Sequence, residues 1–165
     1  MKLRILIGLL LAVGLLAGCG QAAPTATPVP PTPAPAAPAA NGGGAAGPEH
    51  ITVQHILIGF QGSVGDKPIT RTKEQAKTLA YQLLDKAKSG ADFDQLVRDN
   101  TDDAPPGIYS MSNLGVTPAD GEYPREGMVP AFGNVGFALK VGEIGIADYD
   151  PQTSPFGWHI IKRLK

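Results

Sequence analysis

The clearest periodic pattern in this chain is an apolar stripe between residues 72 and 88. Its members recur at helical spacing and are Ala76, Leu79, Ala80, Leu83, Leu84 and Ala87. Such spacing is typical of an amphipathic helix that packs one face against a core. Thr72 and Gln75 form a capping box at its start, and Gly90 follows its end. The pattern therefore predicts a helix from Thr72 to Lys88 whose apolar stripe faces a sheet.

Shorter patterns predict the other elements of the domain. Asp92 is placed to cap a second, shorter helix, and residues 130–139 have room for one or two helical turns. Prolines and glycines between residues 100 and 130 exclude a long element there. Apolar runs favour strands at Ile51–Phe60, around Ile108–Met111, at Glu143–Tyr149 and at Gly157–Leu164. This order of elements predicts an α+β domain in which helices partly cover a small sheet.

Residues 1–18 have the composition of an export signal. A basic start precedes an unbroken apolar run from Ile5 to Ala17, which is shorter than the roughly 20 residues of a membrane span. Residues 16–19, Leu-Ala-Gly-Cys, resemble the lipobox of bacterial lipoproteins. This resemblance implies cleavage before Cys19, the only cysteine, and lipidation of that residue. An uncleaved anchor, or an ordinary secretory signal with an incidental cysteine, is the alternative.

Residues 19–48 comprise the predicted lipidated cysteine and a linker. Gln21 to Pro48 holds eight of the 16 prolines, together with alanine, threonine and glycine, and has no apolar periodicity. A segment of this composition cannot bury a core. At about 3.1 Å per residue it reaches roughly 80–90 Å when extended. We therefore expect one folded domain, Glu49–Lys165, tethered at a distance from a membrane surface.

The charge of this predicted domain argues against a polyanionic partner. Only Lys2 and Arg4 are charged before Glu49, which leaves 12 basic and 15 acidic residues in the domain. No cluster of lysine and arginine stands out, so nucleic acid is not an expected partner. The single cysteine also excludes an internal disulfide.

Two of the predicted strands each contain one histidine among apolar neighbours. His55 lies in the run Val53–Ile58, and His159 lies in Ser154–Ile161, near the end of the chain. A lone histidine in such a strand is most often a structural residue in the core or at a sheet edge, with hydrogen-bond partners for its ring nitrogens. Two of them in comparable strands suggest that the first and last strands are neighbours and that both imidazoles share one site.

Six segments, in their order along the chain, resemble the parvulin family of peptidyl-prolyl isomerases. They are His55–Ile58, Lys88–Phe93, Thr101–Asp103, Gly127–Phe132, Phe137–Ile144 and Ser154–Ile161. The resemblance spans Ile51 to Lys165, which is nearly the whole predicted domain. It implies a parvulin-like α+β fold, with a small, mostly antiparallel four-stranded sheet flanked by about four helices. It also implies a prolyl isomerase that needs no metal or other cofactor.

The resemblance implies a catalytic set of four polar residues. His55 and His159 match the paired histidines that the family carries on adjacent central strands. Asp103 matches an Asp or Cys beside the reacting peptide bond. Ser154 matches a hydroxyl that hydrogen-bonds within the histidine network.

The apolar pocket of the family is matched less completely. Met128 and Phe132 match the floor that receives the prolyl ring, and Phe156 is a candidate for its wall. The glycine-rich run that is usual in the family is replaced here by residues 107–115, and a longer insert follows. Leu114 is the predicted pocket residue of this replaced segment.

Rotation about an X–Pro bond is a reaction for which such residues suffice. The barrier of roughly 18–20 kcal/mol comes from lost amide resonance, and no covalent bond has to break. A dry pocket that binds the twisted amide better than the planar one accelerates rotation without a nucleophile or metal. A zinc site or a hydrolase triad drawn from these residues lacks support, because neither the ligand spacing nor a nucleophile elbow is present.

These inferences predict an extracytoplasmic, membrane-anchored isomerase. Its expected partners are unfolded or partly folded exported proteins with X–Pro bonds, and the membrane through the lipid on Cys19. The alternative is a parvulin-fold chaperone module that binds such segments without turnover. The loop 61–68 has one basic residue, Lys67, where phosphate-directed eukaryotic parvulins carry a basic cluster. A preference for phosphoserine–proline is therefore not expected.

Overall fold

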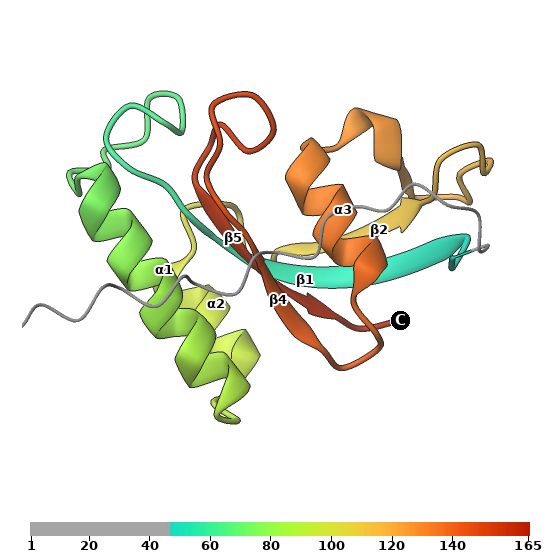
Figure 1. Ribbon diagram of the computed structural model, residues 1–165, viewed down its shortest axis with the longest axis horizontal. Coiled ribbons are helices and arrows are strands. Elements are labelled where there is room, and N and C mark those ends of the chain that lie inside the picture. The colour runs from blue at the N-terminus through green and yellow to red at the C-terminus, as the bar shows by residue number, and fades with distance from the viewer. Residues whose placement is uncertain (1–46) are drawn as a thin grey trace, which may run out of the picture. The chain divides into compact units, whose positions relative to one another are not determined.

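The computed structural model describes residues 47–165 (Figure 1). In chain order the elements are β1 (His50–Ile58), α1 (Lys73–Lys88), α2 (Phe93–Asn100), β2 (Ile108–Ser112), β3 (Tyr123–Pro124), the 3-10 helix η1 (Arg125–Gly127), α3 (Pro130–Ala138), β4 (Ile144–Ala147) and β5 (Trp158–Arg163). The predicted signal, Cys19 and nearly all of the linker lie outside the described residues, so those predictions stay predictions. Within residues 47–165, no helix combines the length and the apolar character that crossing a bilayer requires.

Five strands form one sheet in the order β3-β2-β1-β5-β4. All neighbouring strands are antiparallel except β3, which runs parallel to β2. The first and last strands, β1 and β5, are neighbours, as the two histidine-containing runs predicted. The prediction of four strands was short by one, because β3 consists of Tyr123 and Pro124 alone. A segment of two residues, one of them proline, is too short to show the alternating apolar pattern of a strand. These residues pair with β2 only because the insert brings the chain back beside Met111.

The two faces of this sheet carry separate cores. Successive residues of a strand point to opposite faces, so Ile56 and Ile58 pack with α1 and α2, whereas Ile51 and Val53 pack with α3. Figure 1 shows the corresponding arrangement, with α1 and α2 on one side of the central strands and α3 on the other. His55 lies two residues from both Val53 and Leu57 along β1 and shares their face of the strand. It therefore belongs to the face that α3 covers.

Helix α1 forms as its sequence predicts. The side chain of Thr72 accepts a hydrogen bond from the Gln75 amide at 3.2 Å, and the Gln75 side chain accepts one from the Thr72 amide at 2.8 Å. The buried members of its stripe are Ala76, Ala80, Leu83, Leu84 and Ala87. Leu79 is partly buried against the same core. The helix thus lies on the sheet with the face that the periodicity indicates.

Helix α3 approaches its own face of the sheet closely. A Cβ on Gly136 would lie 3.3 Å from the Cδ1 of Ile51 and 3.3 Å from the Cε of Met111, so glycine allows this approach. α3 is one helix of nine residues, longer than the one or two turns predicted, and Pro130 occupies its first turn. The close packing holds Phe132, in that same turn, against the sheet.

Candidate functional site

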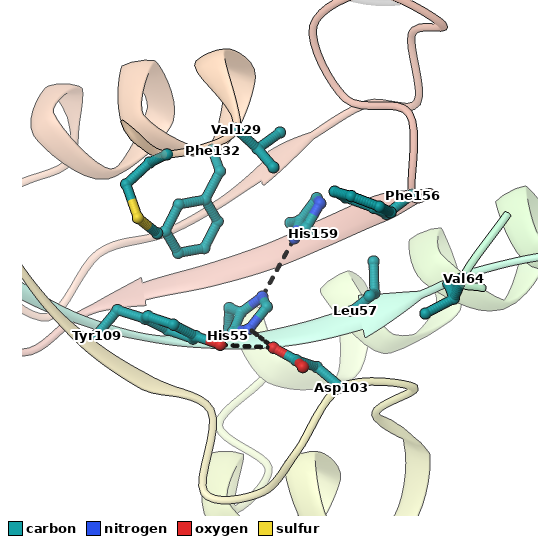
Figure 2. Close-up of a pocket in the computed structure, with 10 residues that line it drawn as sticks. His55, Leu57, Val64, Asp103, Tyr109, Val129, Phe132, Phe156 and His159 are labelled. Carbon is teal, nitrogen blue, oxygen red and sulfur yellow. Dashed lines mark hydrogen bonds and ion pairs between the residues drawn. The ribbon is translucent and has the colours of Figure 1, made fainter. Parts of the chain in front are cut away.

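A cavity of about 250 Å³ opens on the α3 face of the sheet. Ten residues line it: His55, Leu57, Val64, Asp103, Tyr109, Met128, Val129, Phe132, Phe156 and His159 (Figure 2). Strands β1, β2 and β5 contribute its base, and α3 with the segment before it contributes one wall. The remaining residues come from the loops after β1, after α2 and before β5. The lining is mostly apolar, with its polar groups gathered around the two histidines.

The two histidines contact each other through their Nδ1 atoms, which are 3.2 Å apart. In the register of β1 and β5, Leu57 lies opposite His159. His55 is two residues from Leu57 in β1, so its side chain lies on the same face of the sheet as that of His159. The two rings are parallel to within 15°, and the residues are 3% and 4% exposed. Pairing of the first and last strands therefore brings together two side chains that are 104 residues apart in the sequence.

Asp103 extends this contact into a line of three polar side chains (Figure 2). Its Oδ2 is 3.0 Å from the Nε2 of His55, and it accepts a second hydrogen bond, at 2.8 Å, from the Tyr109 hydroxyl. The hydrogen bond from His55 outweighs partial burial and, with that from Tyr109, holds the pKa of the Asp103 carboxyl well below its usual range. An ionised carboxylate only accepts hydrogen bonds, so the shared hydrogen is on the Nε2 of His55.

His159 is the buried and neutral end of this line. Burial lowers the pKa of its imidazole to about 3, and the neighbouring His55 adds to the shift. Its Nε2 is buried and has no hydrogen-bond partner among the described residues. Figure 2 shows this nitrogen on the side of Val129 and Phe156, away from His55. Its hydrogen-bonding capacity is therefore unused within the described part of the chain.

The start of the loop that carries Asp103 is hydrogen-bonded to the end of β1. The Thr101 hydroxyl oxygen accepts hydrogen bonds from the amides of Leu57 at 3.1 Å and Asp103 at 3.2 Å. Asp102 donates its own amide to the Leu57 carbonyl at 2.8 Å. The predicted turn therefore continues the pairing of β1, and this pairing places the carboxylate of its third residue against His55.

Gly107 lets the chain return tightly beside His55. The His55 amide donates to the Gly107 carbonyl at 2.9 Å, and the φ of Gly107 is +66°. A Cβ at this position would lie 2.6 Å from the carbonyl oxygen of His55, so only glycine fits. Strand β2 then starts in a register that places Tyr109 opposite Val53, on the face of the cavity.

Phe132 forms the apolar wall that faces the histidines. It is 2% exposed, and its ring makes edge contacts with His55 (centroids 5.0 Å apart), His159 (5.5 Å) and Tyr109 (5.9 Å). Phe156, at 43% exposed, stands at the rim of the cavity. The arrangement can enclose a small apolar ring while the polar line contacts the group attached to that ring.

Six of the eight residues predicted for the site line this one cavity, namely His55, Asp103, Met128, Phe132, Phe156 and His159. Leu114 does not line it, because it lies in the turn that follows β2, with 58% of its surface exposed. Tyr109 takes the place predicted for Leu114, since the alternation of β2 turns Tyr109 and Met111 toward the α3 face. The prediction for Leu114 was wrong.

Ser154 is fully buried, but it is not joined to the histidines. Its hydroxyl donates to the Gly157 carbonyl at 2.9 Å, inside the turn that precedes β5. Its backbone pairs with that of Asp150 across the same loop. Ser154 thus fixes the loop that carries Phe156, and the prediction that its hydroxyl hydrogen-bonds within the histidine network was wrong.

Four lining residues were missing from the sequence prediction: Leu57, Val64, Tyr109 and Val129. Leu57 had a usable signal, because a residue two positions from His55 in one strand shares its face. Val64 had none, since it comes from an irregular loop. Within the described part of the chain, no group of three or more His, Cys, Asp or Glu side chains is placed to hold a metal ion.

The chain is similar to curated bacterial proteins over most of its domain. It is 32% identical over 119 residues to a parvulin-like PPIase of Rickettsia bellii, covering 72% of this chain and 34% of that protein. It is 28% identical over 124 residues to the chaperone SurA of Pseudomonas fluorescens, covering 74% of this chain and 25% of that protein. The chain therefore spans only about a third or less of the length of these relatives.

Solved structures share the fold. The solution structure of TbPIN1 matches with a TM-score of 0.53 at 25% identity, over 71% of this chain and 98% of that one. Peptidyl-prolyl isomerase ESS1 from Candida albicans matches with a TM-score of 0.51 at 21% identity, over 71% and 63%. These matches confirm the parvulin-like α+β fold that the sequence implied. The family model described as the PPIC-type PPIase domain matches residues 42–165, and the chain therefore belongs to this parvulin family.

Proposed function

We propose that this domain catalyses cis–trans rotation about X–Pro peptide bonds. The observation that carries the proposal is the apolar cavity with a line of three polar side chains, Asp103, His55 and His159, along one wall. Family membership and similarity to a parvulin-like PPIase support it. The cavity, at about 250 Å³, is smaller than the sites that take drug-sized ligands and is of the scale of a prolyl ring.

The apolar part of the cavity would bind the prolyl ring. The ring presents three methylene groups, and each contributes about 0.8 kcal/mol when it is buried. Phe132, Met128 and Leu57 offer the aromatic and aliphatic surfaces for this burial. A held ring fixes the nitrogen side of the peptide bond, so rotation takes place on the carbonyl side.

The polar line would then favour the twisted amide over the planar one. In the planar amide, resonance places negative charge on the carbonyl oxygen and withdraws the lone pair of the nitrogen. Twisting reverses both effects. An ionised Asp103 opposes negative charge on that oxygen, and the buried, neutral His159 contacts His55, which in turn contacts Asp103. Each 1.36 kcal/mol of preference for the twisted state is worth about tenfold in rate.

The proposed setting is outside the cytoplasm, with unfolded or partly folded exported proteins as substrates. The signal-like residues 1–18 and the lipobox around Cys19 support export and lipidation. Similarity to a protein named as a chaperone supports a role in assisting folding. The linker to residue 48 would let the domain reach chains that are held away from the membrane surface.

The second candidate function is a holding module without turnover. It is favoured by large apolar side chains that are exposed at the rim of the cavity and on the strand next to β2, at Phe156 and Tyr123. Such a surface can bind an extended polypeptide through apolar contacts, whether or not a proline is present.

Exchange NMR with an Ala-Pro peptide and the full-length protein in mild detergent separates the two functions. The isomerase predicts excess cis–trans exchange that is strongly reduced in Asp103→Ala, while peptide affinity stays near wild type. Val141→Ala, which is exposed and does not line the cavity, serves as the control and should change neither quantity. Peptide binding without any excess exchange in the wild-type protein would leave the holding module as the function.

A further inference from the structure

Tyr109 is the fourth polar residue of the cavity, beside His55, Asp103 and His159. Its ring lines the cavity, and its hydroxyl donates to the Oδ2 of Asp103 at 2.8 Å. The Nε2 of His55 approaches the same oxygen at 3.0 Å. One carboxylate oxygen therefore receives both donors, one from β1 and one from β2, and Figure 2 shows the two meeting there.

The position of the Tyr109 hydroxyl is set by the packing of its ring against three other aromatic rings. The ring contacts those of His55 (centroids 5.3 Å apart), Phe132 (5.9 Å) and Tyr123 (5.8 Å). Burial, followed by the hydrogen bond to Asp103, raises the pKa of the Tyr109 hydroxyl to about 12. The hydroxyl thus stays a donor at any working pH, and its oxygen is held at one place beside the cavity.

Asp103, in contrast, lies on irregular chain. The residues that follow it, Ala104 to Gly107, form no helix or strand, and the backbone interaction with Ala104 lowers the pKa of the carboxyl less than the hydrogen bond from His55 or from Tyr109 does. Two cations bind the neighbouring Asp102 and do not restrain Asp103. Arg71 pairs with the carboxylate of Asp102, and Lys67 donates to the Asp102 carbonyl.

The charged and titratable groups that face Asp103 are consequently few. His55 from β1 and Tyr109 from β2 touch it directly, and His159 from β5 reaches it only through His55. No lysine or arginine of the described residues forms an ion pair with it. Two hydrogen bonds to one oxygen are therefore the main restraint on the side chain.

We propose that Tyr109 is a positioning residue, which together with His55 holds the Asp103 carboxylate in one orientation at the wall of the cavity. A donor on a rigid strand compensates for the irregular loop that carries the acid. The hydrogen bond also favours the ionised over the protonated carboxyl, so the site keeps its negative charge into acid solution. The consequence for turnover rests on the proposed isomerase function, whereas the link between the two side chains does not.

The decisive variant is Tyr109→Phe in the full-length protein, which removes the hydroxyl and keeps the ring. The matched control is Tyr81→Phe, because the Tyr81 hydroxyl donates to Asp148 at the same 2.8 Å, outside the cavity. Two quantities are measured for each protein. They are the titration of the Asp103 side-chain carboxyl by ¹³C NMR, and the pH profile of kcat/KM for an Ala-Pro peptide by exchange NMR.

In Tyr109→Phe the titration midpoint of Asp103 should rise by on the order of one pH unit, and the acid limb of kcat/KM should rise with it. At neutral pH, kcat should fall several-fold, while KM stays near wild type because the ring still lines the cavity. Tyr81→Phe should leave both titration and profile unchanged. A purely structural role for Tyr109 would lower the melting temperature and leave the Asp103 titration where it was.

An Asp103 midpoint in Tyr109→Phe that stays at the wild-type value would overturn the proposal, and so would an equal shift in Tyr81→Phe. If the wild-type protein shows no isomerase activity, the proposed function fails, but the carboxyl titration still tests the proposal. If Tyr109→Phe does not fold, Asp103→Asn provides the reciprocal test. There the phenol of Tyr109 should titrate below its wild-type value of about 12, and an unchanged phenol titration would overturn the link.

Discussion

Replacing Phe132 by alanine should weaken peptide binding and lower kcat/KM by the same factor. The ring of Phe132 is 2% exposed and stands against the rings of His55, His159 and Tyr109 at the base of the cavity. A prolyl ring would pack on it equally in the planar and the twisted states of the peptide bond. Its loss is therefore a loss of uniform binding, which raises KM and leaves kcat nearly unchanged.

The size of the effect follows from the area that the prolyl ring buries. Three methylene groups at about 0.8 kcal/mol each give roughly 2.4 kcal/mol for complete burial. Phe132 forms one of the walls, so removing its ring should cost about 1 kcal/mol, or roughly fivefold in Kd and in kcat/KM. The same change should lower the free energy of unfolding by about 3 kcal/mol, near the lower end for buried Phe→Ala because one side of the ring already faces a cavity.

The assay measures Kd by titration and exchange rates by NMR for the same Ala-Pro peptide. Phe132→Leu, which keeps most of the volume, should fall between wild type and Phe132→Ala in both quantities and keep the fold intact. Phe156→Ala, at the 43% exposed rim, should change Kd by less than Phe132→Ala does. Wild-type affinity in Phe132→Ala combined with a large loss of kcat would refute the uniform-binding argument and give the ring a role in the twisted state alone.

The remaining predictions concern the fold, the histidine pair, its titration and the anchor. Leu83→Ala should lower the free energy of unfolding by roughly 2–5 kcal/mol in urea denaturation, and a change within error would mean that this helix face is not packed. His55→Gln and His159→Gln should be non-additive in kcat/KM, since the two residues act as one network; additive losses would separate them. His159 has a folded pKa of about 3, below the 6.5 of a free imidazole, so its contribution to stability is lost as the pH falls from 6.5 toward 3; His159→Phe should flatten the pH dependence of unfolding in that window, and an unchanged slope would contradict the neutral assignment. Cys19→Ala should leave the precursor unprocessed or release the protein from membranes, and an unchanged mass and membrane fraction would remove the lipoprotein interpretation.

The elements that could be predicted from the sequence are those whose signals are local. The capping box of Thr72 and Gln75 and the apolar stripe behind it define α1 without reference to any other part of the chain. The pairing of His55 with His159 was also predictable, because two strands of the same character are most simply explained as neighbours. These two features position the helix and the polar centre of the site.

The elements that could not be predicted depend on register and on turns. Choosing between Leu114 and Tyr109 requires knowing where β2 begins, and that is decided by the fit of Gly107 beside His55 rather than by the pattern of β2 itself. The direction of the Ser154 hydroxyl is set by the turn that ends at Gly157. Neither contact can be predicted from the spacing of apolar residues.

The central pairing of β1 with β5 determines when the site can form during synthesis of the chain. Strand β5 completes the sheet beside β1, and Lys165 extends this pairing, since its carbonyl accepts a hydrogen bond from the Thr52 amide at 3.2 Å. A chain that emerges from a ribosome or a translocation channel N-terminus first thus has His55 long before its partner. Such long-range pairing slows folding, and it keeps the pocket unformed until β5 has been released. A copy from which β5 has not yet emerged, or from which it has been removed, would therefore lack His159 and the pocket beside it.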